Sequence, residues 1–174
     1  MIRLENSNDS LSLLLEGLNR AANIITSTMG GTGKNVLLFE KRNLSFTKDG
    51  VSVARKIQFK NPELDAGAQL LINAANQTVQ ECGDGTTLTS LFTQNFVNRL
   101  FKESQNRDIN EILEEAQAEI KKVTEYLINT STKIESVSQI YNIALTSSKS
   151  EKIAKLIQEI YNQTGLKASI SVEQ

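Results

Sequence analysis

The chain has 174 residues, a formal net charge of −1, one cysteine and no histidine. This length suits one ordinary domain, or one domain and the start of another. The near-zero charge argues against a protein that works by neutralising the phosphates of nucleic acids. Without histidine, Ser-His and Cys-His catalysis and histidine-ligated zinc are excluded.

The sequence also lacks the features of a membrane or secreted protein. No apolar run approaches the length of a membrane span, and residues 1–15 lack the order of a secretory signal. The single cysteine cannot form an internal disulfide. We therefore expect a soluble intracellular protein whose partners include neither nucleic acid nor a membrane.

The first predicted element is an amphipathic helix that Asp9 or Ser10 caps. Its apolar residues recur at helical spacing and share one face: Leu11, Leu14, Leu15, Leu18, Ala22, Ile25 and Met29. We expect this helix to run to Gly30. The glycine-rich loop that follows, residues 30–35, has backbone N–H groups free to bind an anion.

A β-hairpin is predicted next. Residues 36–39 are apolar and β-prone, residues 44–47 alternate, and the polar residues between them suit a loop. The turn that follows sets Lys48 beside Asp49, and taken alone it is most simply a solvated turn. Residues 51–59 fit a short helix or a strand equally well. Asn61-Pro62 then supplies the cap and the first turn of a long helix.

The chain is organised around Glu81-Cys82-Gly83-Asp84-Gly85-Thr86-Thr87, which ends that helix and opens another. Cys82 lies on the apolar stripe of the first helix, so we expect a small core residue. The helix that starts at Thr86 presents unpaired N–H groups and partial positive charge, which suits a phosphate. One carboxylate, Asp84, is about what Mg²⁺ needs when phosphate oxygens and waters fill its other positions. The alternative is a plain corner in which Gly83 ends one helix and Asp84 caps the next.

Helices are predicted over most of the remaining chain. One runs to about Ser104, a longer one follows a possible capping box at residues 108–111, and two shorter ones are centred on residues 137–145 and 153–160. Residues 146–150 form a joint between the last two. Gly165 should stop the last helix, and Ile170 and Val172 alternate as in a strand.

In this order and at these separations, the motifs strongly resemble those of the N-terminal part of a group I chaperonin of the GroEL type. The matching strings are Thr28-Met29-Gly30-Gly31-Thr32-Gly33-Lys34-Asn35-Val36, Thr47-Lys48-Asp49-Gly50-Val51-Ser52-Val53-Ala54-Arg55, Gly67-Ala68-Gln69, Gly83-Asp84-Gly85-Thr86-Thr87 and Lys155-Leu156-Ile157. The resemblance implies a mainly α fold with a small β-hairpin. Residues 1–130 would be the N-terminal half of an equatorial, ATP-binding domain. Residues 131–174 would begin an intermediate domain and end at the apical-domain boundary.

The resemblance also implies a Mg-ATP site. Thr28, Met29 and Gly30 would lie along the adenine and phosphate side of the nucleotide. Lys48 would approach the phosphates.

The remaining implied roles belong to two turns. Gly85, Thr86 and Thr87 would hold the β- and γ-phosphates, and Asp84 would bind Mg²⁺. Asp49 would lie near the γ-phosphate as the catalytic residue. The carboxylate that activates water in the family belongs to a segment outside these residues, so we expect little or no ATPase activity from this chain alone.

The implied function is ATP-dependent protein folding by a subunit of an oligomeric ring. Its partners would be other chaperonin subunits and unfolded polypeptide, in the bacterial cytosol or an organelle matrix. An alternative is a degenerate, non-catalytic chaperonin-like interaction protein. Leu88 favours it, because the family has a third threonine there, and so do the altered joint near residues 143–146 and the absent segments. An unrelated nucleotide kinase would need a general base, an acceptor site and a strand-to-helix phosphate loop, and none is evident.

Overall fold

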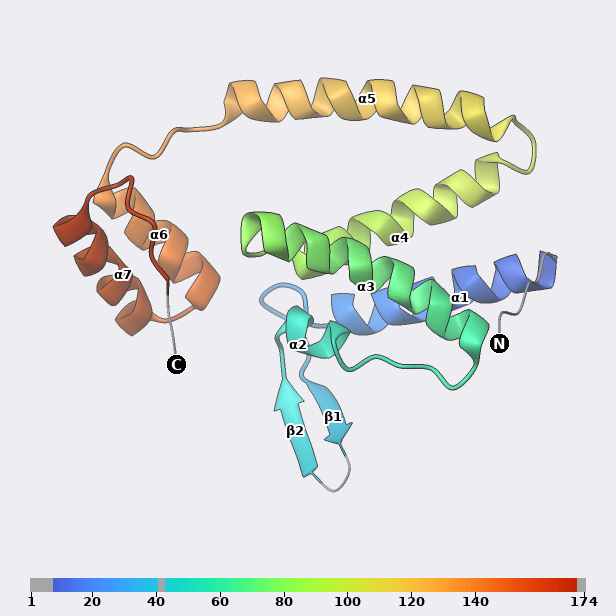
Figure 1. The fold of residues 1–174 in the computed structure, drawn as a ribbon, viewed down its shortest axis with the longest axis horizontal. Coiled ribbons are helices and arrows are strands. Elements are labelled where there is room, and N and C mark those ends of the chain that lie inside the picture. The colour runs from blue at the N-terminus through green and yellow to red at the C-terminus, as the bar shows by residue number, and fades with distance from the viewer. Residues whose placement is uncertain (1–7, 41–42, 172–174) are drawn as a thin grey trace. The chain divides into compact units, whose positions relative to one another are not determined.

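The computed structural model describes residues 8–40 and 43–171. Their elements, in chain order, are α1 (Asn8–Thr26), β1 (Val36–Glu40), β2 (Asn43–Thr47), α2 (Gly50–Ala54), α3 (Pro62–Cys82), α4 (Thr86–Glu103), α5 (Ile109–Thr130), α6 (Val137–Ser148) and α7 (Glu151–Thr164) (Figure 1). The predicted mainly α fold with one small hairpin is confirmed. No helix among the described residues is long and apolar enough to cross a membrane.

The chain divides into two compact units, Met1–Glu114 and Glu115–Gln174, and the division falls inside α5. Each unit is described by itself below. The predicted boundary between an equatorial and an intermediate segment, at residue 130, stays a prediction.

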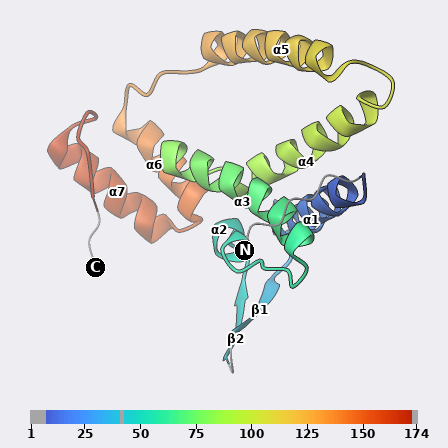
Figure 2. The same cartoon turned by 45° about the vertical axis from the view of Figure 1, so that its right-hand side comes forward.

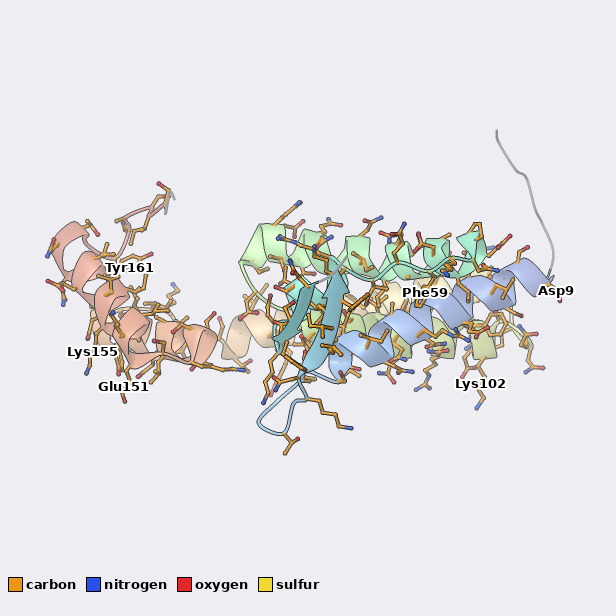
Figure 3. All side chains as sticks on the ribbon, turned by 90° about the horizontal axis from the view of Figure 1, so that it is seen from below. Asp9, Phe59, Lys102, Glu151, Lys155 and Tyr161 are labelled. Carbon is orange, nitrogen blue, oxygen red and sulfur yellow. The ribbon has the colours of Figure 1, made fainter. Side chains whose placement is uncertain are left out.

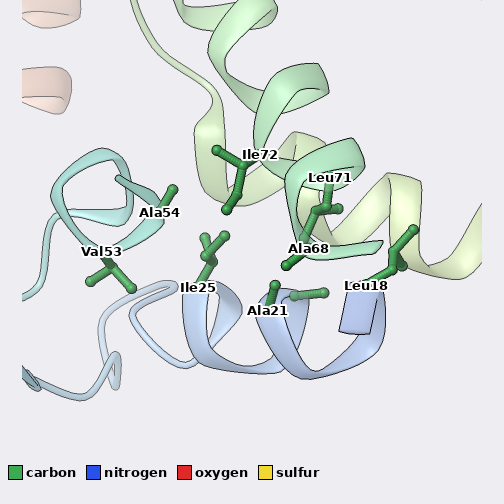
Figure 4. Close-up of a cluster of buried hydrophobic side chains, with 9 residues drawn as sticks. Leu18, Ala21, Ile25, Val53, Ala54, Ala68, Leu71 and Ile72 are labelled. Carbon is green, nitrogen blue, oxygen red and sulfur yellow. The ribbon is translucent and has the colours of Figure 1, made fainter. Parts of the chain in front are cut away.

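The core of the first unit lies where α1, α2 and α3 meet (Figure 4). Its buried apolar side chains are small or medium in size: Leu18, Ala21, Ala22, Ile25, Val53, Ala54, Ala68, Leu71 and Ile72. Because four of the nine are alanines, the helix backbones can approach one another closely.

The closest approach joins α1 to α3 through two glycines. A Cβ at Gly17 would overlap the carbonyl group of Leu64, and a Cβ at Gly67 would overlap the carbonyl group of Leu14. The two contacts are reciprocal, since each helix contributes one glycine and one carbonyl. Any larger residue at either position would force the two helices apart.

Helix α1 ends at Thr26, four residues short of the predicted end at Gly30. Three consecutive hydroxyls turn back onto backbone carbonyls: Thr26 Oγ1 donates to Ala22, Ser27 Oγ to Ile24 and Thr28 Oγ1 to Ile25, at 2.7–2.8 Å. Such bonds compete with the helical pattern and often bend or end a helix. The last N–H groups accordingly make tighter bonds, from Thr28 to Ile25 and from Met29 to Thr26.

The hairpin pairs β1 with β2 in antiparallel register, Val36 opposite Thr47 and Phe39 opposite Leu44. In both views it projects away from α1, α3 and α4 of the same unit (Figures 1 and 2). Phe39 and Phe46 are 73% and 71% exposed, so the hairpin buries little apolar surface within this unit. Residues 51–59, for which the sequence fitted a helix or a strand, form the end of the short helix α2 up to Ala54 and then turns and irregular backbone.

Helix α3 begins as predicted. The side chain of Asn61 accepts a hydrogen bond from the N–H of Leu64 at 2.9 Å, and Pro62 occupies the first turn. Phe59, labelled in Figure 3, lies just before this cap, and its N–H donates to the carboxylate of Asp65 at 2.8 Å. The half-buried ring of Phe59 packs against the core and so holds the segment between α2 and α3 in place.

The second unit contains the helical pair α6 and α7. Ser136 and Gln139 form a capping box at the start of α6, and Ser150 caps α7. Only Lys149 and Ser150 separate the helices, so the predicted joint at residues 146–150 is shorter than expected. Glu151 and Lys155, labelled in Figure 3, lie one turn apart on α7 with their charged groups 3.5 Å apart.

The expected strand near the end of the chain is not present in the described residues. Gly165 ends α7 as predicted, and residues 165–171 form turns and irregular backbone. Ile170 is therefore not in a strand, and Val172 lies outside the described residues. The alternation of two apolar residues did not determine a strand, because the described residues of this unit contain no second strand to pair with.

We predict that Gly67→Ala destabilises the first unit by about 1–3 kcal/mol, because the added methyl group meets backbone of α1 rather than a movable side chain. Helix propensity alone would favour alanine by about 1 kcal/mol, so the sign of the change separates the two effects. Urea unfolding measures it. Gly31→Ala is the matched control, since its Cβ would meet nothing within 4 Å. Equal unfolding midpoints for the two variants would contradict the close approach.

Candidate functional site

The turn between α3 and α4 leaves the start of α4 open to a ligand. Gly83 ends α3 in the left-handed conformation, and its N–H donates to Val79. Gly85, at φ 107°, precedes α4, a conformation that a residue with a Cβ rarely adopts. No side chain caps the first turn of α4. Contrary to the alternative interpretation of the sequence, Asp84 is not the cap of α4; its Oδ1 accepts from the N–H of Gly85 at 2.6 Å.

A buried hydroxyl lies directly at this helix start. Thr86 is 3% exposed, and its Oγ1 has no hydrogen-bond partner within the described structure. The neighbouring hydroxyl of Ser90 is fully buried but satisfied, because it donates to the carbonyl of Thr86 at 2.8 Å. A buried polar atom without a partner costs about 1–3 kcal/mol. Such an atom beside unpaired helix N–H groups is typical of a site that a polar ligand completes.

An open pocket of about 480 Å³ lies over this turn. It is lined by Met29, Cys82, Asp84, Gly85, Thr87 and Leu88. Four of these were predicted site residues, and the fold brings Met29 from the glycine-rich loop to the other three from the second motif. The wall of this pocket therefore contains both oxygen-bearing and apolar side chains.

Two lining residues were not among the predicted site residues, although Leu88 was noted in the sequence as standing where the family has a threonine. Cys82 was expected in the core but is exposed, because it belongs to the last turn of α3, beyond the buried stretch that ends at Ala75. Leu88 is 61% exposed at the pocket. The signal for both was their position beside Asp84 and Thr87 in the motif.

The loop after α1 is held by its own backbone. The N–H of Lys34 donates to the carbonyl of Ser27 at 2.7 Å, and that of Gly33 donates to Gly30 at 3.1 Å. Thr28 is buried beneath the loop with its hydroxyl committed to Ile25. Thr28 and Gly30 therefore shape the loop, and Met29 is the predicted residue of this loop that reaches the pocket.

The Lys48–Asp49 turn reaches the same region through Gly50. A Cβ at Gly50 would overlap the hydroxyl of Thr87, so the N-terminus of α2 lies against the first turn of α4. Lys48 and Asp49 are exposed and do not line the pocket. The turn thus lies beside the pocket rather than in its wall.

Asp49 has a defined structural task. It precedes α2 as the cap, and its Oδ2 accepts from the N–H of Ser52 at 2.8 Å and from the Ser52 hydroxyl at 2.6 Å. Partial burial acts to raise its pKa, but these hydrogen bonds, a further one from the Val51 N–H, and the charge of Arg55 outweigh burial. The pKa of Asp49 is therefore lowered.

The described residues offer no cluster of three or more metal-ligating side chains. A cation at Asp84 would need to draw its other ligands from a phosphate and from water, which is the coordination Mg²⁺ prefers. The residues present thus fit a nucleotide-bound Mg²⁺ and not a resident metal held by protein alone. The roles assigned to individual residues from the sequence stay predictions.

Comparison with known proteins identifies the fold. Residues 21–168 match the TCP-1/cpn60 chaperonin family. This chain belongs to that family. The match includes the loop after α1, the Lys48–Asp49 turn, the Gly85–Thr87 segment and all of α6 and α7.

The similar proteins are much longer than this chain. Chaperonin GroEL of Aster yellows witches'-broom phytoplasma is 32% identical over 92% of the chain and 30% of its own length. The hydrogenosomal chaperonin HSP60 of Trichomonas vaginalis is 34% identical over 97% of the chain and 37% of its own. Chaperonin gp146 of bacteriophage EL 2 (Pseudomonas aeruginosa), crystallised in the presence of ATP-BeFx, is 31% identical with a TM-score of 0.79, over 91% of this chain and 28% of that one. The chain therefore spans about a third of the length of these relatives.

We predict that Ser52→Ala raises the pKa of Asp49 toward its ordinary value, because the carboxylate loses a hydroxyl donor. Titration of the Asp49 carboxyl carbon by NMR measures the change. Since the folded-state pKa is lowered, the stabilisation by this cap is present above the unfolded-state pKa and is lost as pH falls through the folded-state pKa. Ser45→Ala on the exposed strand β2 is the control and should leave the titration unchanged. An identical Asp49 titration in both variants would contradict the assignment.

Proposed function

We propose that this chain is part of a chaperonin subunit and binds Mg-ATP in the pocket over the α3–α4 turn. The observation that carries the proposal is the buried, unpartnered hydroxyl of Thr86 beside the uncapped start of α4. A phosphate oxygen supplies the acceptor that this hydroxyl lacks and meets the free N–H groups of the first turn. The negative charge of the phosphate also suits the positive end of the helix dipole.

Each lining residue then has a chemical task. Gly85 and Thr87 line the pocket and bind the β- and γ-phosphates together with Thr86, which is buried at the start of α4 and does not line the pocket. Asp84 supplies one carboxylate oxygen to Mg²⁺. Met29 supplies apolar surface for the base, on the loop that Thr28 and Gly30 shape. Lys48, on the turn beside the pocket, adds positive charge near the phosphates.

The proposal extends to a full-length chaperonin subunit like the relatives, which are about three times as long as this chain. Its activity is ATP-dependent folding of unfolded polypeptide by an oligomeric ring of chaperonin subunits. The relatives include GroEL chaperonins and a hydrogenosomal chaperonin, which supports the cytosol or an organelle matrix as the location. The phage chaperonin studied in the presence of ATP-BeFx supports a nucleotide ligand.

Hydrolysis is proposed to be weak in this chain. Asp49 is the catalytic candidate, but its carboxylate is engaged as the cap of α2 and its pKa is lowered. A carboxylate with a lowered pKa accepts a proton poorly. Nucleotide binding without rapid turnover follows from this arrangement.

A second candidate function is supported by Leu88. This exposed apolar side chain lines the pocket beside the oxygen atoms that would hold phosphate. An apolar group there removes a possible hydroxyl ligand, which favours a chaperonin-like interaction protein that binds other chaperonin subunits without nucleotide.

Titration calorimetry of the chain with ATP and Mg²⁺ separates the two functions. We expect binding that Asp84→Ala weakens by about tenfold or more, because a charged ligand of the cation is lost. Glu159→Ala on the exposed face of α7 removes one charge elsewhere and should bind as the parent chain does. A folded chain that binds no Mg-ATP and co-purifies with a larger chaperonin would support the interaction protein instead.

Thr86→Val provides a test in which stability and binding move in opposite directions. Valine keeps the shape and removes the unpartnered hydroxyl, so stability in the absence of ligand should stay the same or rise by up to about 1–3 kcal/mol. Affinity for Mg-ATP should fall about tenfold, because the hydroxyl no longer meets a charged phosphate oxygen. Thermal unfolding and calorimetry measure the two effects.

Thr89→Val on the same helix is the matched control. Its Oγ1 donates to the hydroxyl of Thr78 at 3.1 Å, so its loss should lower stability and leave affinity unchanged. If Thr86→Val lowers stability and keeps full affinity, the hydroxyl serves the fold and not a phosphate.

A further inference from the structure

A group of amide side chains joins α1 to α4 away from the pocket. Asn19 and Asn98 pair reciprocally: Asn19 Nδ2 donates to Asn98 Oδ1 at 3.0 Å, and Asn98 Nδ2 donates to Asn19 Oδ1 at 2.6 Å. Gln94 Nε2 donates to Asn19 Oδ1 at 3.1 Å and to Asn23 Oδ1 at 2.9 Å. We call these four residues, Asn19, Asn23, Gln94 and Asn98, the amide ladder.

The ladder fixes both the direction and the register of the two helices. Asn19 pairs with Asn98 and Gln94, and Asn23, one turn later on α1, pairs with Gln94. Residue numbers thus increase along α1 while those of the partners decrease along α4, so the two helices run antiparallel. Following the ladder from Asn98 to Gln94 on α4, and from Asn19 to Asn23 on α1, leads toward the pocket. The loop of Met29 lies at the end of α1, and Thr86 lies about two turns beyond Gln94.

Apolar packing alone leaves this register weakly defined. The two buried residues of α4 are Thr86 and Ser90, and both are polar. The apolar side chains of α4 are at most partly buried; they include Leu91, Phe96, Val97, Leu100 and Phe101, of which Val97 packs against the core cluster. Hydrophobic burial is non-directional, so a helix with this little buried apolar surface can slide or tilt at small cost. Hydrogen bonds between amides are directional and short in range, and they define one register.

The turn at the other end does not remove this freedom. Gly83 and Gly85 both have positive φ, and glycine allows many alternative torsions. The turn therefore fixes where α4 starts but not where it points. The bond from Thr89 to Thr78 lies within the first turns and also leaves the far end of α4 undetermined.

We infer that the amide ladder positions the two halves of the pocket, setting the loop of Met29 against the Asp84–Thr87 turn so that both meet one nucleotide. This inference rests on the proposed Mg-ATP site and adds positioning residues that lie outside it. None of the four ladder residues lines the pocket. They act through helix register rather than by contact with the ligand.

The test replaces the reciprocal pair while keeping its shape. In the double variant N19L/N98L both amides become leucine side chains of similar size. Replacing both partners of a hydrogen bond by apolar groups of the same shape can be nearly neutral for stability. We expect the melting temperature to stay close to that of the parent chain and the affinity for Mg-ATP to fall about tenfold, as phosphate contacts lose their alignment.

Asn95→Leu is the matched control on the same helix. Asn95 is exposed, and its amide donates to Leu91 within α4 at 2.8 Å, so it should bind Mg-ATP as the parent chain does. Parent-like affinity of N19L/N98L would overturn the inference. So would a loss of affinity that appears only together with an equivalent loss of stability, because the ladder would then be purely structural.

A measurement without nucleotide keeps the inference separate from the proposed function. Met29 and Leu88 both line the pocket, one on the α1 side and one on α4. In a C82S/M29C/L88C chain, a short bifunctional thiol reagent should link the two sides. Adding N19L/N98L should abolish most of that linking, and adding N95L should not. Unchanged linking overturns the ladder's role, whereas a parent chain that links normally but binds no Mg-ATP overturns the proposed function alone.

Discussion

The reciprocal contact of α1 and α3 through Gly17 and Gly67 is the constraint on which the first unit depends. Each glycine lies against a carbonyl group of the other helix, so the backbones meet without intervening side chains. The remaining core can then be built from alanines and a few larger residues. This crossing positions α1 against α3, and α2 packs against the C-terminal part of α1 through Val53 and Ala54. The position of the glycine-rich loop is therefore a consequence of two missing Cβ atoms.

Helix α4 depends on a different kind of interaction. It buries polar rather than large apolar side chains, and amides join it to α1. The first unit thus combines a close-packed pair, which has little freedom to adjust, with a third helix held by directional bonds. The pocket lies between the loop that follows α1 and the turn that begins α4. Its walls come from segments distant in sequence, because Met29 follows α1 and the other lining residues belong to the end of α3 and the start of α4.

The features predicted correctly from the sequence are those decided within a few residues. Asn61 and Pro62 determine the start of α3 through their own side chains, and Gly165 ends α7. The errors have long-range or competing local causes. The end of α1 was misplaced because three hydroxyls turn onto the backbone. The strand expected at Ile170 would need a partner that periodicity cannot supply. The nearness of Met29 to Asp84 could be expected from family resemblance, but the exposure of Cys82 at the same pocket required the fold.

The two acidic candidates of the site have different environments, and this difference bears on what the chain can do. Asp84 lies at the pocket, and its Oδ1 accepts one backbone N–H from the next residue. Asp49 lies beside the pocket, caps α2 and has a lowered pKa. A general base works best when its pKa lies near the operating pH, which a capped carboxylate of this kind does not satisfy. Its permanent negative charge can still orient a cation or a water molecule. On the proposed assignment, nucleotide binding and hydrolysis depend on different groups, so a segment of a chaperonin would retain binding without hydrolysis.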